Sequence, residues 1–303
     1  MLRLSVWNVQ RLIRMDVAHI PDLRRTLDLS SRALTLPFRM EAKPLNIGQM
    51  RAEWLIGSQS QETRRVLLFV HGGGYAVGSL QTHRGLAGAI AQAAGARCLL
   101  IDYRLAPEHP FPAGLEDAAL AYQYLLQQGY APHEIAIAGD SAGGGLSLAL
   151  LLSLRELGVP LPAACVCMSP WVDLTFSGES AKTFASQDPI VLVPQVRGWA
   201  DVYAGRYALE HPMISPLYAD LSGLPPVLIQ ASDSEVLTDD ARRLGARLAA
   251  AGNDVTLQIW PGTLHVWQLF WRYIPEAEDA VARIGRFLQA RWTSAASGRD
   301  MAA

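Results

Sequence analysis

The 303-residue sequence carries little charge and few cysteines, and each shortage excludes a class of protein. Charged residues make up 18% of the chain and the formal net charge is −2, so no basic surface is predicted to hold nucleic acid. Cys98, Cys165 and Cys167 are the three cysteines, and their spacing does not match a zinc site. Reduced thiols in predicted buried strands favour a cytoplasmic protein.

No uncharged run is long enough for a membrane span, so we expect none. The chain also lacks a G-K-[ST] phosphate loop and a dinucleotide G-x-G-x-x-G turn, which argues against a nucleotide-binding protein. No sequence feature implies a metal or another cofactor.

Half of the residues are hydrophobic, which is ample for a large buried core. After residue 52, apolar segments of strand length alternate with segments of helix length, which predicts a mostly parallel sheet with helices on both faces. We therefore expect one α/β domain over residues 1–303. Its predicted strands lie near 64–70, 97–103, 134–139, 163–169, 226–232 and 254–260. Its predicted helices lie near 1–18, 81–95, 113–128, 141–157, 238–252 and 275–292.

The alternation breaks between about residues 172 and 216, a stretch with Pro189, Pro194, Pro212 and several aromatic residues. This stretch is too long for an ordinary connection between elements. We interpret it as a cap over the mouth of a site.

Residues 139–143 read Gly-Asp-Ser-Ala-Gly between a predicted strand and a predicted helix. This G-x-S-x-G pattern is typical of a sharp turn that exposes a serine hydroxyl, because its glycines allow close backbone approach. The alternative is a glycine-lined helix start that binds an anion. Ser141 is the candidate nucleophile.

Two other segments supply complementary chemistry. Residues 71–74, His-Gly-Gly-Gly, follow a predicted strand, and backbone N–H groups in such a loop can stabilise an oxyanion. His265 follows the last predicted strand and is the candidate general base. A Ser, then acid, then His order along the chain is the order that an α/β-hydrolase requires.

With these motifs in place, the chain resembles the hormone-sensitive-lipase-like family of α/β-hydrolase esterases. The resemblance rests on residues 71–74, 103–113 (Tyr-Arg-Leu-Ala-Pro-Glu-His-Pro-Phe-Pro-Ala), 139–144, 169–171 (Ser-Pro-Trp) and the His265 loop. It implies an α/β-hydrolase fold with a helical cap, to which residues 1–45 also contribute. It further implies a serine carboxylesterase acting on short to medium acyl esters. The oxyanion donors would be the N–H groups of Gly73, Gly74 and Ala142.

The sequence offers more than one candidate for the acid of the triad. Related sequences often carry Asp-Pro-Leu-x-Asp-Glu here, and alignment on Leu237 places Glu235 at the acid's position, with Asp233 as the alternative. Asp239 and Asp240 suit the first turn of a helix behind a Thr238 N-cap.

The leading hypothesis is hydrolysis of a small-molecule ester. An amidase or arylformamidase on the same fold is a second possibility, and a hydrolase-like ligand receptor without catalysis is a third. A homodimer through an edge strand or a helix near the C-terminus is also an expectation from the family.

Overall fold

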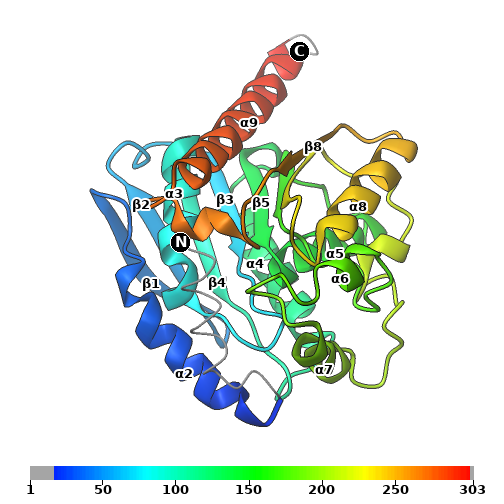
Figure 1. The fold of residues 1–303 in the computed structure, drawn as a ribbon. Helices are drawn as coiled ribbons and strands as arrows, with labels where there is room; N and C mark the ends of the chain where they lie inside the picture. The colour runs from blue at the N-terminus through cyan, green and yellow to red at the C-terminus, as the bar shows by residue number, and fades with distance from the viewer. Residues whose placement is uncertain (1–16, 301–303) are drawn as a thin grey trace.

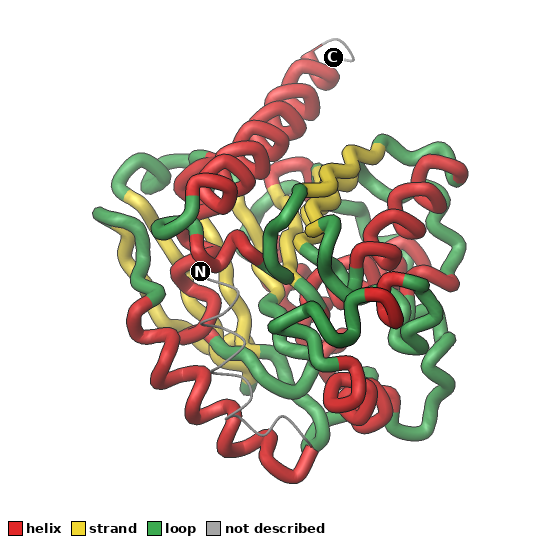
Figure 2. The backbone as a smooth tube through the Cα atoms, in the orientation of Figure 1, coloured by secondary structure: helices red, strands yellow, loops and turns green. Residues whose placement is uncertain are grey.

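The computed structural model describes residues 17–300, with side chains up to residue 293 (Figures 1 and 2). A twisted eight-stranded sheet forms the centre, with the strand order β1-β2-β4-β3-β5-β6-β7-β8. The strands are β1 Met40–Ile47, β2 Met50–Gly57, β3 Val66–Val70, β4 Arg97–Asp102, β5 Ile135–Asp140, β6 Ala164–Met168, β7 Val227–Ser232 and β8 Val255–Trp260.

The described helices are α2 Ile20–Ser30, α3 Leu80–Ala94, α4 Ala113–Gln127, α5 Ala142–Glu156, α6 Ser180–Thr183, α7 Val193–Ala204, α8 Thr238–Ala250 and α9 Pro275–Asp300. Short 3₁₀ turns are η1 Val17–His19, η2 Ser31–Ala33, η3 Pro132–Glu134, η4 Pro216–Tyr218 and η5 Trp267–Phe270. None of the helices described within residues 17–300 is long and apolar enough to cross a membrane.

Strands β3 to β8 pair in parallel, and the fold confirms the predicted α/β class. All six predicted strands and five of the predicted helices are present, with strand ends within two residues of the expected positions. Helix α9 is longer than expected, because it continues to Asp300 and projects from the body of the molecule (Figure 1). The helix expected over residues 1–18 lies outside the described residues except at its end.

The hairpin of β1 and β2 was not predicted from the sequence. β1 pairs with β2 in antiparallel fashion along its whole length, and β2 pairs with β4 in the same sense. β1 is an edge strand with exposed polar residues and Pro44, so its pattern is not that of a buried strand. Residues 40–45 therefore belong to the sheet, which limits any N-terminal cap to the residues before Met40.

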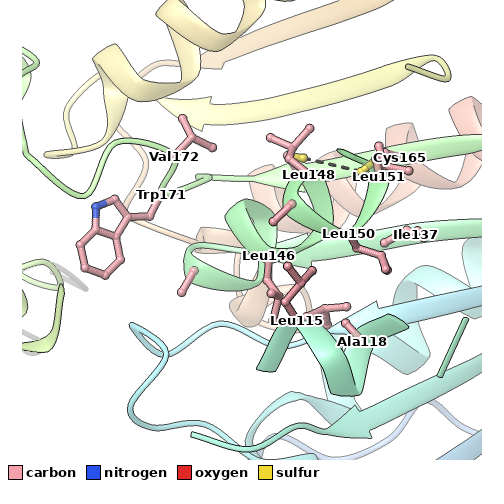
Figure 3. Packing of buried hydrophobic residues seen from close by; sticks show 14 of the residues in the cluster. Leu115, Ala118, Ile137, Leu146, Leu148, Leu150, Leu151, Cys165, Trp171 and Val172 are labelled. Carbon is pink, nitrogen blue, oxygen red and sulfur yellow. Dashed lines mark hydrogen bonds between the residues drawn. The ribbon is translucent and has the colours of Figure 1, made fainter. Parts of the chain in front are cut away.

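Apolar side chains bind helices to both faces of the sheet. The larger core cluster packs α4, α5 and α8 on one face, and the second packs α3 and α9 on the other. Figure 3 shows α5 packed beside α4, with Leu146, Leu148, Leu150 and Leu151 of α5 and Leu115 and Ala118 of α4 among the residues drawn. Burial of one leucine side chain contributes about 1.5–3 kcal/mol, so this helix holds the first turn after β5 firmly.

Gly285 lets α9 lie directly on the backbone of α3. A Cβ atom at this position would lie 2.5 Å from the carbonyl oxygen of Ala93. We expect Gly285→Ala to destabilise the fold by about 1–3 kcal/mol in urea unfolding, because overpacking outweighs the better helix propensity of alanine. The control is Gly198→Ala in α7, where the nearest described atom to a Cβ is Val17 Cγ2 at 3.4 Å. Equal stability of the two variants would contradict the close contact.

Candidate active site

Ser141 lies on a strained turn between β5 and α5, with φ 52° and ψ −122°. A non-glycine residue in this region costs about 1–3 kcal/mol, and the surroundings must hold it there. The Ser141 N–H donates to the carbonyl of Met168 at 2.8 Å. Side chains at Gly139 and Gly143 would overlap backbone atoms, those of Gly143 and Val70 respectively, so only glycine fits on either side.

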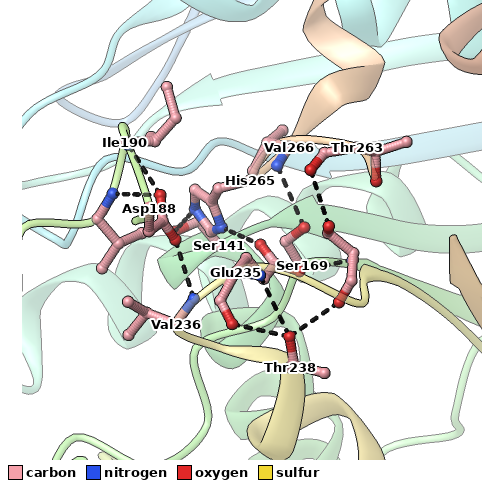
Figure 4. Close-up of polar contacts among 12 residues, drawn as sticks. Ser141, Ser169, Asp188, Ile190, Glu235, Val236, Thr238, Thr263, His265 and Val266 are labelled. Atoms are coloured by element: carbon pink, nitrogen blue, oxygen red, sulfur yellow. Dashed lines mark hydrogen bonds and ion pairs between the residues drawn. The ribbon is translucent and has the colours of Figure 1, made fainter. Parts of the chain in front are cut away.

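The structure brings Ser141, His265 and Glu235 together at one edge of the sheet (Figure 4). His265 Nε2 lies 2.9 Å from Ser141 Oγ, and His265 Nδ1 lies 2.6 Å from Glu235 Oε2. The three residues follow β5, β8 and β7, whose carboxyl ends meet at this edge. Both His265 and Glu235 are buried.

Glu235 and Asp233 occupy different places in the loop after β7. Glu235 Oε1 accepts the N–H of Ser232 at 2.8 Å, which leaves Oε2 for the imidazole. Asp233 Oδ1 instead accepts the N–H of Gly262 at 2.9 Å. Asp233 therefore fastens the loop before His265, and Glu235 is the acid next to the imidazole.

Thr238 is not an N-cap, contrary to the sequence prediction. It is the first residue of α8, and its hydroxyl donates to the carbonyls of Ser232 and Glu235 at 2.9 and 2.7 Å. Asp239 and Asp240 do lie in the first turn of α8, but they bind neighbouring loops. Asp239 accepts the N–H of Ser180, and Asp240 accepts those of residues 172 and 173.

The His265 loop is held by two serines to which the sequence analysis assigned no role. The N–H of Val266 donates to Ser169 Oγ at 3.1 Å, and Ser232 Oγ donates to the carbonyl of Thr263 at 2.9 Å. Val266 itself has a positive φ of 49°. Ser169 belongs to the Ser-Pro-Trp motif named above, but a serine at the end of a strand carries no pattern that predicts its partner.

The glycine loop after β3 has the backbone conformation that glycine permits. Gly73 and Gly74 have φ of 118° and 60°. A side chain at Gly74 would overlap the indole of Trp199 on α7, and one at Gly73 would overlap the carbonyl of Val77. Ala142 is the first residue of α5, so its N–H has no acceptor within the helix.

A buried polar cluster lies behind this loop. Asp140 Oδ1 accepts the N–H of Gly72 at 3.1 Å, and Asp140 Oδ2 lies 3.3 Å from His83 Nε2. His71 stacks on Tyr103 with ring centroids 4.4 Å apart. Asp140 thus links the residue before Ser141 to the glycine loop.

The electrostatics of the site follow from burial and from the carboxylates around His265. Burial disfavours the charged imidazolium, but the hydrogen bond and charge of Glu235, with smaller effects of Asp188 and Asp140, outweigh it and raise the pKa of His265 above 6.5. Burial also raises the pKa of Glu235, and the hydrogen bond from His265 opposes that change. Burial, together with the charge of His83, lowers the pKa of His71 to about 3.

The fold and the arrangement of side chains define a hydrolase of the α/β-hydrolase class. The family model described as alpha/beta hydrolase fold matches residues 67–269. An acetyl-hydrolase of Streptomyces hygroscopicus is 44% identical over 245 residues, which are 81% of each chain. An esterase of Acinetobacter venetianus is 34% identical over 266 residues, covering 88% of this chain and 87% of the relative.

Solved structures agree with this class. A crystal structure of an esterase from the bacterial hormone-sensitive lipase family has a TM-score of 0.91 and 44% identity, covering 96% of this chain and 97% of the other. The esterase EstE5, soaked with p-nitrophenyl butyrate, has a TM-score of 0.83 and 38% identity, covering 91% of this chain and 99% of the other. The chain belongs to the hormone-sensitive-lipase-like family of α/β-hydrolases, and it is an esterase.

The pKa of His71 should lie below that of an ordinary histidine, and the pKa of His265 should lie above it. We expect NMR of the imidazole ¹⁵N nuclei to show His71 neutral down to about pH 4, because its pKa lies at about 3. The His265 ring should become protonated at a pH above 6.5, because Glu235 stabilises the imidazolium. A His71 ring that titrates near 6.5 would contradict its burial behind the glycine loop.

Proposed function

We propose that the chain hydrolyses carboxylic esters with short to medium acyl groups through a Ser141–His265–Glu235 triad and an acyl-enzyme intermediate. The observation that carries the proposal is the continuous chain of contacts from Ser141 Oγ to His265 Nε2, at 2.9 Å, and from His265 Nδ1 to Glu235, at 2.6 Å. Both distances suit proton transfer from the hydroxyl to a base that is oriented by an acid.

In the proposed reaction, His265 Nε2 accepts the Ser141 proton while Oγ attacks the ester carbonyl. Glu235 accepts the Nδ1–H, which fixes the tautomer, and its charge stabilises the imidazolium. The imidazolium then returns the proton to the leaving alcohol. Water, activated by the same imidazole, hydrolyses the acyl-enzyme and releases the acid.

The N–H groups of Gly73, Gly74 and Ala142 are the proposed donors to the oxyanion. The positive φ of both glycines and the position of Ala142 at the start of α5 support this assignment. Removal of one such donor typically costs about 10²–10³ in kcat. The hydrogen bond from Gly72 N–H to Asp140 supports the loop from behind.

Preference for short to medium acyl groups rests on relatives and on aromatic packing beside the glycine loop. One relative is named an acetyl-hydrolase, and the crystals of another were soaked with a butyrate ester. Trp199 packs against Gly74, and Tyr75 stacks on Tyr203 with ring centroids 3.7 Å apart. We infer that these buried rings limit the room beside the reacting carbonyl.

We also propose that the enzyme acts in the cytoplasm. Cys98, Cys165 and Cys167 are free and buried, as expected for a reducing compartment. The substrate would be a small-molecule ester, and water is the second reactant.

Variants of the proposed triad should lose activity in a defined order. We expect Ser141→Ala to lower kcat for p-nitrophenyl butyrate by about 10⁶, because no nucleophile remains. Glu235→Gln should lower kcat by about 10⁴, because the amide disfavours the required tautomer. The matched control is Asp233→Asn, which should stay within a few-fold of the wild type. The reverse ranking of Glu235 and Asp233 would contradict the assignment of the acid.

The acyl preference is tested by a series of p-nitrophenyl esters from acetate to palmitate. We expect kcat/KM to peak at short to medium chains, because we infer that the buried rings near Gly74 limit the room for the acyl group. A maximum at palmitate would overturn this part of the proposal. Matched p-nitroanilides in the same assay distinguish an esterase from an amidase, which would cleave the anilides at comparable rates.

A further inference from the structure

Asp188 is a buried carboxylate that the proposed mechanism does not use. It lies between α6 and α7 and is 1% exposed. Its Oδ1 accepts the N–H groups of Ile190 and Val191 at 2.8 and 3.0 Å, and its Oδ2 accepts that of Val236 at 2.9 Å. Among the described residues, no lysine or arginine forms a salt bridge with Asp188. Backbone dipoles are therefore its main partners.

The third of these contacts reaches the residue directly after Glu235. Val236 is held at both of its peptide groups by the same segment, because its carbonyl accepts the Ser180 hydroxyl at 2.7 Å. Ser180 N–H also donates to Asp239 Oδ2 at 2.8 Å. Residues 180–188 therefore contact the loop that carries the proposed acid at two points, both on Val236, and the first turn of α8 at Asp239 (Figure 4 shows the Asp188 contacts).

The same stretch of chain continues into α7, which packs against the other half of the site. Trp199 lies against Gly74, and Tyr203 stacks on Tyr75 at 3.7 Å. Residues 180–204 thus form one segment. Its first part contacts the loop that carries Glu235, and its last part contacts the glycine loop after β3. Asp188 is the one buried charged side chain within residues 180–204.

We propose that Asp188 is a positioning residue for the triad: together with Ser180 it fastens residues 180–204 to the loop that carries Glu235. The inference rests on the proposed function. It adds a role that needs no contact with substrate, because Asp188 acts through Val236, Glu235 and His265.

Three carboxylates bear on the charge of His265. Glu235 makes the direct contact at 2.6 Å, and Asp188 and Asp140 add to the pKa increase through their charge, whereas burial opposes it. Loss of the Asp188 charge therefore lowers the pKa of His265. Because the neutral imidazole is the base, the acid limb of kcat/KM then moves to lower pH.

The test compares wild-type enzyme, Asp188→Asn and Ser180→Ala with p-nitrophenyl butyrate across pH. We expect Asp188→Asn to lower kcat about 10- to 100-fold with little change in KM, since displacement of the loop that carries Glu235 misplaces the base. Its acid limb should move to lower pH. Ser180→Ala keeps the Asp188 charge, so it should lower kcat several-fold and leave the acid limb unmoved.

Asp240→Asn is the matched control, because Asp240 is also buried and accepts two backbone N–H groups, at 2.9 and 3.0 Å, from another loop. Thermal unfolding of each variant establishes that it is folded at the assay temperature. The proposal is overturned if Asp188→Asn keeps wild-type kcat and acid limb, or if Asp240→Asn moves the limb equally. If Asp188→Asn does not fold, Ser180→Ala alone tests the contact between residues 180–204 and the loop that carries Glu235. A wild-type kcat in Ser180→Ala then overturns the proposal.

Ser141→Ala separates this inference from the function on which it rests. If Ser141→Ala is inactive and Asp188→Asn behaves as the wild type, the esterase mechanism stands and the positioning role fails. If Ser141→Ala retains activity, the proposed function itself fails.

Discussion

The position of Ser141 depends on two backbones that approach each other almost without side chains between them. Gly143, the second residue of α5, leaves room for the carbonyls of Val70 and His71, and a Cβ on Gly72 would lie 2.8 Å from the carbonyl of Asp140. The serine turn and the glycine loop are therefore fixed relative to each other by contact. Any displacement of one loop moves the other, so the hydroxyl and the proposed oxyanion donors stay in register.

The second constraint is the negative charge of the carboxylates around His265. Hydrogen bonds from backbone N–H groups stabilise these buried carboxylates. Glu235 accepts one such group, Asp140 accepts one, and Asp188 accepts three. The donors are the last residue of β7, two loops at the carboxyl edge of the sheet and the segment that leads into α7. The carboxylates consequently order these loops while they favour a charged His265, so structure and electrostatics are set by the same contacts.

Sequence patterns could predict what depends on local order along the chain. Continuous apolar runs located the parallel strands, and the motifs placed Ser141 and His265 after two of them. The β1–β2 hairpin was missed because an exposed edge strand with Pro44 buries only its ends. Asp188 was missed because its contact with Val236 spans 48 residues, and no periodicity encodes such a pairing. The prediction of Thr238 as an N-cap was wrong because its hydroxyl donates to carbonyls that precede α8.

Glutamate as the proposed acid fits the contacts around residue 235. Val236 stands where the related pattern has proline, so this chain has an N–H to offer at that position, and Asp188 accepts it. A proline there would leave Asp188 Oδ2 without this donor, and a buried carboxylate oxygen without a partner is costly. The longer Glu235 side chain, the N–H of Val236 and the buried Asp188 therefore form one consistent set. Replacement of Glu235 by the commoner aspartate would change the reach of the acid while this tether still held the backbone in place.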